Sequence, residues 1–202
     1  MCGFLCVIDF NHEIRNYTEI LNPLSVHRGP DNQSAISGEN FYFYFRRLSI
    51  QDLSDRSNQP FISKNKNIFL VFNGEIYNFK ELRDELIALG HEFITTGDTE
   101  VVMKCYEEWD ENCVVKLQGM FSFCIWDSNK KKFLAYRDRF GIKPLYYCKY
   151  KSQFIVSSEI KDIIAINQDK SENKSVVIKY LARGFLDDNT ETFYKNVTSL
   201  KP

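Results

Sequence analysis

Met1-Cys2-Gly3-Phe4-Leu5-Cys6-Val7-Ile8-Asp9-Phe10 opens the chain, and this stretch decides the fold. From Gly3 to Phe10 apolar residues occupy both faces of an extended segment, which is typical of a strand buried between two layers. We therefore expect Cys2 to lie at the open end of a rigid, buried strand.

Cys2 can combine a nucleophile and its base in one residue. A cysteine directly after the initiator methionine has a small side chain, so we expect Met1 to be removed. The thiolate is the nucleophilic form of cysteine. A free α-amine with a pKa of about 7.7–8.0 is roughly one quarter neutral near pH 7.4 and can act as the base. A cysteine at position 2 also occurs by chance, so this stretch alone leaves catalysis open.

The composition is that of an ordinary globular protein. The chain has 202 residues, 44% of them apolar and 26% charged, so disorder is not expected. Its 17 phenylalanines and 11 tyrosines suit a body rich in sheets, because aromatic side chains pack well on a pleated surface. The formal net charge is −1, and basic residues cluster only at Lys130-Lys131-Lys132, so we expect no nucleic-acid partner.

The sequence also argues against a membrane protein and a metal site. No apolar run approaches the length of about 18 residues that spans a bilayer, and no secretory leader precedes the first strand. We therefore expect a cytoplasmic protein whose six cysteines are free thiols. No C-x-x-C or histidine–cysteine cluster occurs, so no metal site is expected.

Hydrophobic periodicity predicts an α+β protein. The expected strands cover residues 3–10, 41–48, 68–72, 120–126, 132–137, 145–150 and 153–157. The expected helices cover residues 17–21, 78–89, 99–109, 159–166 and 175–182. Elements in this order indicate sheets packed on each other with helices outside.

Asn73 and Gly74 are candidates for stabilising an oxyanion. A thiolate that attacks an amide produces an oxyanion, which needs donors held in place beforehand. Asn73 offers a side-chain amide, and Gly74 offers a backbone N–H that no side chain covers. The same dipeptide is the commonest turn former, so taken alone it favours a turn that ends the third strand at Phe72.

Arg47 and Asp98 are candidates for binding an amino acid. Arg47 follows a strand and could hold a carboxylate through two parallel N–H bonds, which a lysine could not. Asp98, just ahead of a helix, could meet an ammonium group. A helix cap or an ordinary turn carboxylate would explain Asp98 equally well.

From Met1 to about Leu200, the chain resembles the glutaminase half of glutamine-hydrolysing asparagine synthetases. The motifs that carry the resemblance are, in order, Met1-Cys2-Gly3-Phe4, His27-Arg28-Gly29-Pro30-Asp31, Arg47-Leu48-Ser49-Ile50, Phe72-Asn73-Gly74-Glu75-Ile76-Tyr77-Asn78, Gly97-Asp98-Thr99-Glu100 and Asp138-Arg139-Phe140-Gly141-Ile142-Lys143-Pro144-Leu145-Tyr146-Tyr147. The resemblance implies the N-terminal-nucleophile fold, a four-layer αββα sandwich. It also implies a class II glutamine amidotransferase.

The resemblance assigns a role to each candidate residue. Cys2 would be the nucleophile, with its α-amine as base, and Asn73 and Gly74 would form the oxyanion hole. Arg47 would hold the α-carboxylate of glutamine and Asp98 its α-ammonium group. The remaining substrate-binding residues would be Leu48, Ser49, Ile50, Gln51 and Glu75. The segments 27–31 and 138–147 would be scaffold without a catalytic role.

The resemblance also implies partners. Synthetases of this kind pass ammonia to a second domain, which uses ATP and Mg²⁺ to make asparagine from aspartate. The Ser-Gly-Gly-x-Asp-Ser loop of that domain does not occur here, so we expect no cofactor in this chain. Residues 2–202 would form the glutaminase domain, with 166–202 leading toward a synthetase domain. The expected partners are L-glutamine and a C-terminal synthetase domain or separate synthetase chain, and a homodimer is possible.

Other interpretations stay open. The acceptor of the ammonia could be a sugar or a peptide, because several amidotransferases share this glutaminase half. The chain could also be a truncated regulatory module without turnover. A cysteine–histidine protease is disfavoured, because His12, His27 and His91 do not match a protease signature.

Overall fold

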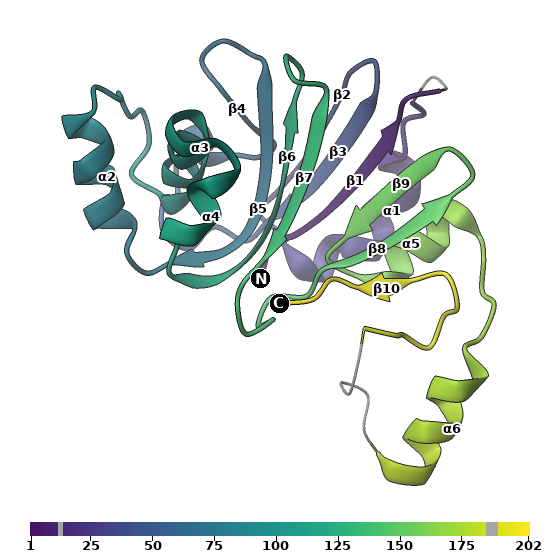
Figure 1. The fold of residues 1–202 in the computed structure, drawn as a ribbon. Coiled ribbons are helices and arrows are strands. Elements are labelled where there is room, and N and C mark those ends of the chain that lie inside the picture. Colours follow the sequence, from purple (N-terminus) through teal and green to yellow (C-terminus); the bar gives the residue numbers. More distant parts are fainter. Residues whose placement is uncertain (12–13, 185–189) are drawn as a thin grey trace.

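Two antiparallel sheets form the centre of the molecule (Figure 1). The computed structural model describes residues 1–11, 14–184 and 190–202, so His12 lies outside the described residues. The larger sheet has the order β10-β8-β9-β1-β3-β2 and the smaller sheet the order β4-β5-β6-β7. The strands are β1 (Gly3–Asp9), β2 (Asn32–Ser37), β3 (Phe41–Arg47), β4 (Phe61–Ile62), β5 (Ile68–Ile76), β6 (Gly119–Asp127), β7 (Lys132–Arg137), β8 (Tyr146–Tyr150), β9 (Gln153–Ser157) and β10 (Thr198–Ser199).

Most of the helices cover the outer faces of the two sheets (Figure 1). They are α1 (Thr18–Ser25), α2 (Phe79–Ala88), α3 (Asp98–Trp109), α4 (Cys113–Lys116), α5 (Ile160–Asn167) and α6 (Lys174–Arg183). In Figure 1, α2, α3 and α4 lie beside the smaller sheet, α1 and α5 lie beside the larger one, and α6 projects from the body. Three apolar clusters fill the spaces between these layers. The fold is therefore the predicted four-layer αββα sandwich.

β1 is buried on both faces because its side chains alternate between two of these clusters. Phe4, Cys6 and Ile8 pack between the sheets, whereas Leu5 and Val7 pack against the layer of α1 and α5. β1 pairs with β3 on one side and with β9 on the other. The prediction of a buried strand behind Cys2 is confirmed, and its central position gives Cys2 a rigid support.

β5 corrects one prediction. It runs through Asn73 and Gly74 to Ile76, so the expectation that this dipeptide ends the strand as a turn is wrong. Gly74 pairs with Phe121 of β6, and a Cβ at position 74 would lie only 2.4 Å from the carbonyl oxygen of Met120. The glycine is needed for the close approach of two strands, so both residues belong to a rigid sheet.

The other differences concern weak sequence signals. The helix predicted over residues 17–21 extends to Ser25, and α3 begins at Asp98 rather than at Thr99. β2, β4 and β10 were not predicted. β2 has the polar sequence NQSAIS and lies at the edge of its sheet, and β4 and β10 contain two residues each. Such elements depend on pairing with a neighbour and have little periodicity of their own.

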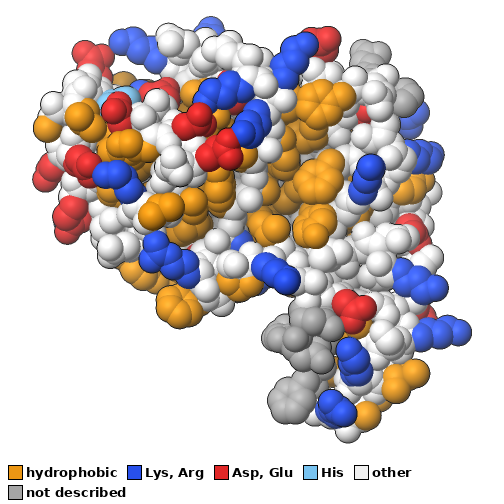
Figure 2. Space-filling model, in the orientation of Figure 1, with side chains coloured by type: hydrophobic (Ala, Val, Ile, Leu, Met, Phe, Trp, Pro, Cys, Tyr) orange, Lys and Arg blue, Asp and Glu red, His pale blue; other side chains and the backbone are white. Residues whose placement is uncertain are grey.

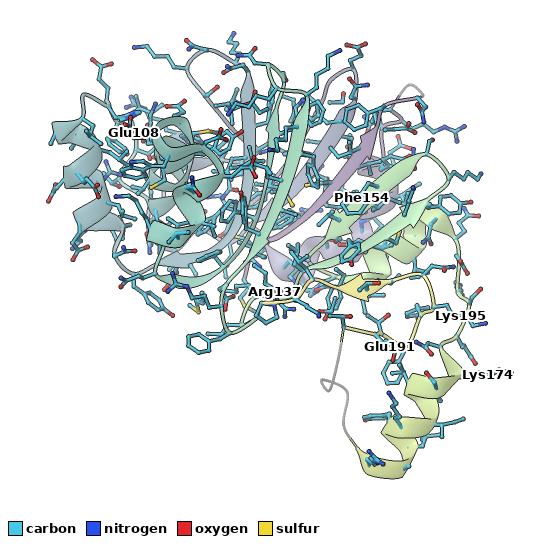
Figure 3. The ribbon with its side chains drawn as sticks, in the orientation of Figure 1. Glu108, Arg137, Phe154, Lys174, Glu191 and Lys195 are labelled. Atoms are coloured by element: carbon cyan, nitrogen blue, oxygen red, sulfur yellow. The ribbon has the colours of Figure 1, made fainter. Side chains whose placement is uncertain are left out.

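Aromatic side chains join the two sheets on the face shown in Figure 2, where hydrophobic side chains gather over the middle of the molecule. Phe154 of β9, labelled in Figure 3, has its ring centroid 6.1 Å from that of Phe133 in β7 and 5.6 Å from that of Tyr147 in β8. Among the described residues, no helix combines the length and apolar character needed to cross a membrane.

Candidate active site

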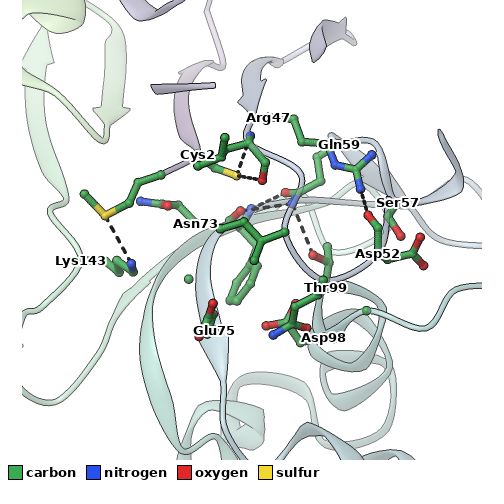
Figure 4. Close-up of a pocket in the computed structure, with 17 residues that line it drawn as sticks. Cys2, Arg47, Asp52, Ser57, Gln59, Asn73, Glu75, Asp98, Thr99 and Lys143 are labelled. Atoms are coloured by element: carbon green, nitrogen blue, oxygen red, sulfur yellow. Dashed lines mark hydrogen bonds between the residues drawn. The ribbon is translucent and has the colours of Figure 1, made fainter. Parts of the chain in front are cut away.

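A cleft at the ends of β1, β3 and β5 gathers the predicted site residues (Figure 4). It encloses about 650 Å³, part of it open to solvent, and is lined by Met1, Cys2, Arg47, Leu48, Ile50, Gln51, Asp52, Ser57, Gln59, Phe72, Asn73, Gly74, Glu75, Gly97, Asp98, Thr99 and Lys143. Every predicted site residue except Ser49 lines this cleft. Ser49 lies beside it and donates its backbone N–H to Asp31 at 2.7 Å. Residues from both sheets and from α3 thus meet in one place.

The Cys2 thiol faces the backbone of Leu48. Its Sγ accepts the Leu48 N–H at 3.3 Å and lies 3.5 Å from the Leu48 carbonyl oxygen. Burial raises the pKa of the Cys2 thiol, and the Leu48 N–H and the positive amino terminus oppose this rise. Because burial dominates, the thiol needs a nearby base to become a nucleophile.

Hydrogen bonds at the start of β1 hold Cys2 in place. The backbone N–H of Phe4 donates to Ser158 Oγ at 3.2 Å, and the N–H of Ser158 donates to the Phe4 carbonyl at 3.0 Å. A Cβ on Gly3 would lie 2.9 Å from Cγ of Arg28, which in turn pairs with Glu159. The glycine after Cys2 therefore gives the Arg28 side chain room to pack against β1.

The segment 27–31 supports the cleft from behind. A Cβ on Gly29 would lie 2.4 Å from the carbonyl carbon of Arg47, so only glycine allows this approach. The N–H of Asp31 donates to the Arg47 carbonyl at 3.1 Å. These contacts fix the backbone at the end of β3, which carries Arg47 into the cleft.

Asn73 brings an unsatisfied donor to the cleft. The residue is 2% exposed, and its Nδ2 has no hydrogen-bond partner among the described residues. A buried donor without a partner costs free energy, so such groups are rare outside functional sites. Gln59 holds the adjacent backbone, because its Oε1 accepts the Phe72 N–H at 2.6 Å and its Nε2 donates to the Phe72 carbonyl at 3.2 Å.

Arg47 is a fixed cation. Its Nη1 donates to the Ser54 carbonyl at 2.9 Å and to Asn58 Oδ1 at 2.7 Å, and its Nη2 donates to the Asp52 carbonyl. These three bonds leave two of the five guanidinium N–H donors for another acceptor. The loop around residues 52–58 therefore orients Arg47, and sequence reasoning did not find this support.

Asp98 provides a buried carboxylate opposite Arg47. It is the first residue of α3, Gly97 holds the N-cap position, and Asp98 Oδ2 accepts the N–H of Ile76 at 3.0 Å. Burial raises the pKa of Asp98 to about 6, Glu75 contributes to this rise, and the Ile76 N–H opposes it. The interpretation of Asp98 as an N-cap is wrong, because Gly97 holds that position and the Asp98 carboxylate accepts a hydrogen bond from β5.

Five residues of the cleft were not among the predicted site residues. Asp52, Ser57 and Gln59 lie outside the quoted motifs, whereas Thr99 and Lys143 lie inside motifs but were given no role at the site. Lys143 lies in the segment 138–147, to which the sequence analysis gave no catalytic role. Among residues 1–11, 14–184 and 190–202, no group of three or more histidine, cysteine, aspartate or glutamate side chains could hold a metal ion.

Comparison with known proteins identifies the family. A model of the glutamine amidotransferase domain matches residues 1–202. The chain belongs to this family. It is 36% identical over its whole length to asparagine synthetase [glutamine-hydrolyzing] 1 of Bacillus subtilis, of which it spans 32%. It is 37% identical over its whole length to a putative asparagine synthetase [glutamine-hydrolyzing] 2 of Methanocaldococcus jannaschii, of which it spans 42%.

The amidotransferase domain is also similar to proteins that are not named asparagine synthetases, and to solved structures with the same fold. Amidase chyE of Penicillium rubens is 40% identical over 69% of the chain, which spans 20% of that protein. The structure of glutamine phosphoribosylpyrophosphate amidotransferase from Bacillus subtilis, complexed with ADP and GMP, matches with a TM-score of 0.56. That match has 20% identity and covers 81% of this chain and 37% of the other. The amidotransferase domain therefore spans less than half of the length of these relatives.

Proposed function

We propose that this domain hydrolyses the side-chain amide of L-glutamine through a thioester on Cys2, giving glutamate and ammonia. The observation that carries the proposal is one cleft that holds the Cys2 thiol, the unpaired Nδ2 of Asn73, the fixed cation of Arg47 and the buried carboxylate of Asp98. Together these groups match a nucleophile, an oxyanion donor and the two charges of an α-amino acid.

Binding would orient the amide toward Cys2. The two free N–H donors of Arg47 hold the α-carboxylate, and Asp98 accepts from the α-ammonium group. Glu75 lines the same cleft and adds negative charge near that ammonium group. Because Arg47 and Asp98 are fixed by their own hydrogen bonds, the substrate does not have to order them.

The chemistry then proceeds in two halves. With Met1 removed, the α-amine of Cys2 takes the thiol proton, and Sγ attacks the amide carbon while Asn73 and Gly74 stabilise the oxyanion. The intermediate collapses with cleavage of the C–N bond, the α-ammonium returns the proton to the leaving nitrogen, and ammonia departs. Water then attacks the thioester, so that glutamate leaves and the thiol is restored.

The ammonia would serve asparagine synthesis. The relatives named as asparagine synthetases support a synthetase domain or chain as partner, which would bind ATP and Mg²⁺ and aminate aspartate. The reaction would then belong to amino-acid biosynthesis, and we propose the cytoplasm as its compartment. The second candidate function is glutamine hydrolysis that supplies ammonia to another acceptor. It is suggested by two amidases, from Penicillium rubens and Gibberella zeae, that match this domain but are not named asparagine synthetases.

The test compares ammonia release from three forms of the protein. The chain whose intact mass corresponds to a Cys2 start should release ammonia and glutamate from glutamine in equal amounts. Cys2→Ser, and a chain with an uncleavable extension ahead of Cys2, should lose at least a hundredfold in rate. Undiminished release from either changed form would contradict the proposal.

A further inference from the structure

Asp52 connects the two side chains that the proposed function assigns to the charges of the substrate. Its backbone carbonyl accepts the Nη2 donor of Arg47, a bond drawn in Figure 4. Its side-chain Oδ2 accepts the backbone N–H of Thr96 at 2.9 Å and the Thr96 hydroxyl at 3.1 Å. Thr96 precedes Asp98 by two residues, so one residue contacts Arg47 at one end and the segment that carries Asp98 at the other.

The segment 94–97, which leads into α3, is also held by the two helices beside it. Arg83 of α2 donates from Nη1 to the Thr95 carbonyl at 2.9 Å and from Nη2 to the Gly97 carbonyl at 3.1 Å. Glu100 of α3 is 3% exposed and accepts both the N–H and the hydroxyl of Thr95 at 2.7 Å. These contacts fix the segment within the helical layer, whereas the contact with Asp52 comes from the loop after β3.

Gln59 makes a second and longer connection to α3. Its Nε2 donates to Thr99 Oγ1 at 3.4 Å, in addition to its bond with the Phe72 carbonyl at 3.2 Å. Hydrogen bonds to an ionised acceptor are roughly twice as strong as those between neutral groups. The Asp52 carboxylate, with two bonds of 2.9 and 3.1 Å to Thr96, is therefore the stronger connection between the loop that orients Arg47 and the start of α3.

The Asp52 carboxylate is itself held in place. Its Oδ1 accepts the N–H of Ser54 at 2.8 Å, so both of its oxygens accept hydrogen bonds. Hydrogen bonds from Ser54 and Thr96 lower the pKa of Asp52, so the carboxylate stays ionised at neutral pH. A Cβ on Gly97 would have Cβ of Asp52 as its nearest atom, 3.5 Å away. The side chain of Asp52 therefore lies beside the residue that immediately precedes Asp98.

We propose that Asp52 is a positioning residue that sets the separation between Arg47 and Asp98, and so makes the site specific for a ligand with both a free α-carboxylate and a free α-ammonium group. The inference rests on the proposed function, in which these two side chains bind those two groups. A ligand with both charges gains both interactions only when its partners are correctly spaced. A ligand with one charge can shift toward its single partner. Loss of the Asp52 carboxylate should therefore weaken only the binding of a ligand with both charges.

The test measures kcat and KM for glutamine, and how well three ligands protect Cys2 from alkylation by iodoacetamide. L-Glutamate carries both α-charges, glutarate lacks the ammonium group, and 4-aminobutyrate lacks the α-carboxylate. Asp52→Ala removes the carboxylate but keeps the carbonyl that accepts from Arg47. It should raise KM for glutamine, and weaken protection by L-glutamate, roughly tenfold. Protection by the other two ligands, and kcat, should stay within about twofold of the wild type.

Thr96→Val tests the same connection with a smaller change. It removes an exposed hydroxyl and keeps the backbone N–H that Asp52 accepts. It should weaken protection by L-glutamate about threefold in the wild-type background and have no further effect in Asp52→Ala. Asp84→Ala, at an exposed position of α2, is the matched control and should change none of these values.

Unchanged protection by L-glutamate in Asp52→Ala, or an equal loss of protection by either ligand with one charge, would overturn the inference. An effect of Thr96→Val that adds in full to that of Asp52→Ala would overturn it as well, because the two residues would then act separately. In each of these cases a wild-type protein that hydrolyses glutamine leaves the proposed function intact. If the wild-type protein instead fails to hydrolyse glutamine, the proposed function fails and the role of Asp52 falls with it.

Discussion

Replacement of Asp98 by asparagine should make the protein more stable at neutral pH and a worse binder of glutamine. Asp98 is 6% exposed, and its pKa is raised from 3.8 to about 6, mainly by burial. At about 1.4 kcal/mol for each pKa unit, ionising this carboxyl in the folded protein costs about 3 kcal/mol. Asparagine removes the charge, and its side-chain oxygen can still accept the Ile76 N–H.

The pH dependence fixes the sign of the effect. A carboxyl whose folded-state pKa is raised binds its proton more tightly in the folded state, so its contribution to stability is present at low pH. That contribution is lost as the pH rises from about 4 to about 6. Asp98→Asn should therefore match the wild type near pH 4 and exceed it by up to about 3 kcal/mol at pH 7.

Urea unfolding at the two pH values, together with steady-state kinetics, measures both effects. A hydrogen bond to a charged group contributes about 1.5–3 kcal/mol. Loss of this bond to the substrate ammonium should therefore raise KM roughly 10- to 150-fold. Asp84→Asn, at an exposed position of α2, is the control and should show neither change. A difference in unfolding free energy that is absent at pH 7, or equal at both pH values, would refute this account of Asp98.

Three further substitutions test the rest of the cleft. Asn73→Ala should lower kcat about 10²–10³-fold, as loss of an oxyanion donor does. Thermal unfolding should show no loss of stability, because Nδ2 has no hydrogen-bond partner in the described part of the chain. An unchanged kcat would exclude Asn73 as a donor. Gly74→Ala should lower the free energy of unfolding by about 1–3 kcal/mol, because its Cβ would meet the Met120 carbonyl. Gly97→Ala, whose Cβ would have its nearest atom 3.5 Å away, should lower it less. Equal losses in urea titrations would contradict this. Arg47→Lys should raise KM for glutamine at least tenfold, since lysine cannot offer two parallel donors; a KM within about twofold of the wild type would count against a carboxylate at this position.

The sequence predicted the sandwich where apolar patterns decide the structure. β1 and β3 are apolar on both faces because each contacts two layers, and this pattern is visible in the sequence alone. The prediction of a turn at Asn73-Gly74 was wrong because the same dipeptide can either form a turn or permit the close approach of two strands. Only the pairing of β5 with β6, which is a contact between distant residues, decides between the two.

The roles of the cleft residues were assigned from the family resemblance. That resemblance did not reveal the groups that hold Arg47 and Asn73 in position. Arg47 is oriented by the carbonyls of Asp52 and Ser54, and Asn73 is held through Gln59. Backbone acceptors carry no residue-type signature, so no pattern in the chain reports them. Lys143 was assigned to scaffold for a similar reason, because nothing in its local sequence shows that its side chain reaches Met1.

Mass mapping after inactivation with an electrophilic glutamine analogue, such as a diazo-ketone, tests the central claim most directly. The account predicts a single adduct on the sulfur of a peptide that begins at Cys2, and protection of that sulfur by glutamine. An adduct on Cys6, Cys105, Cys113, Cys124 or Cys148, or on a peptide that still carries Met1, would contradict it.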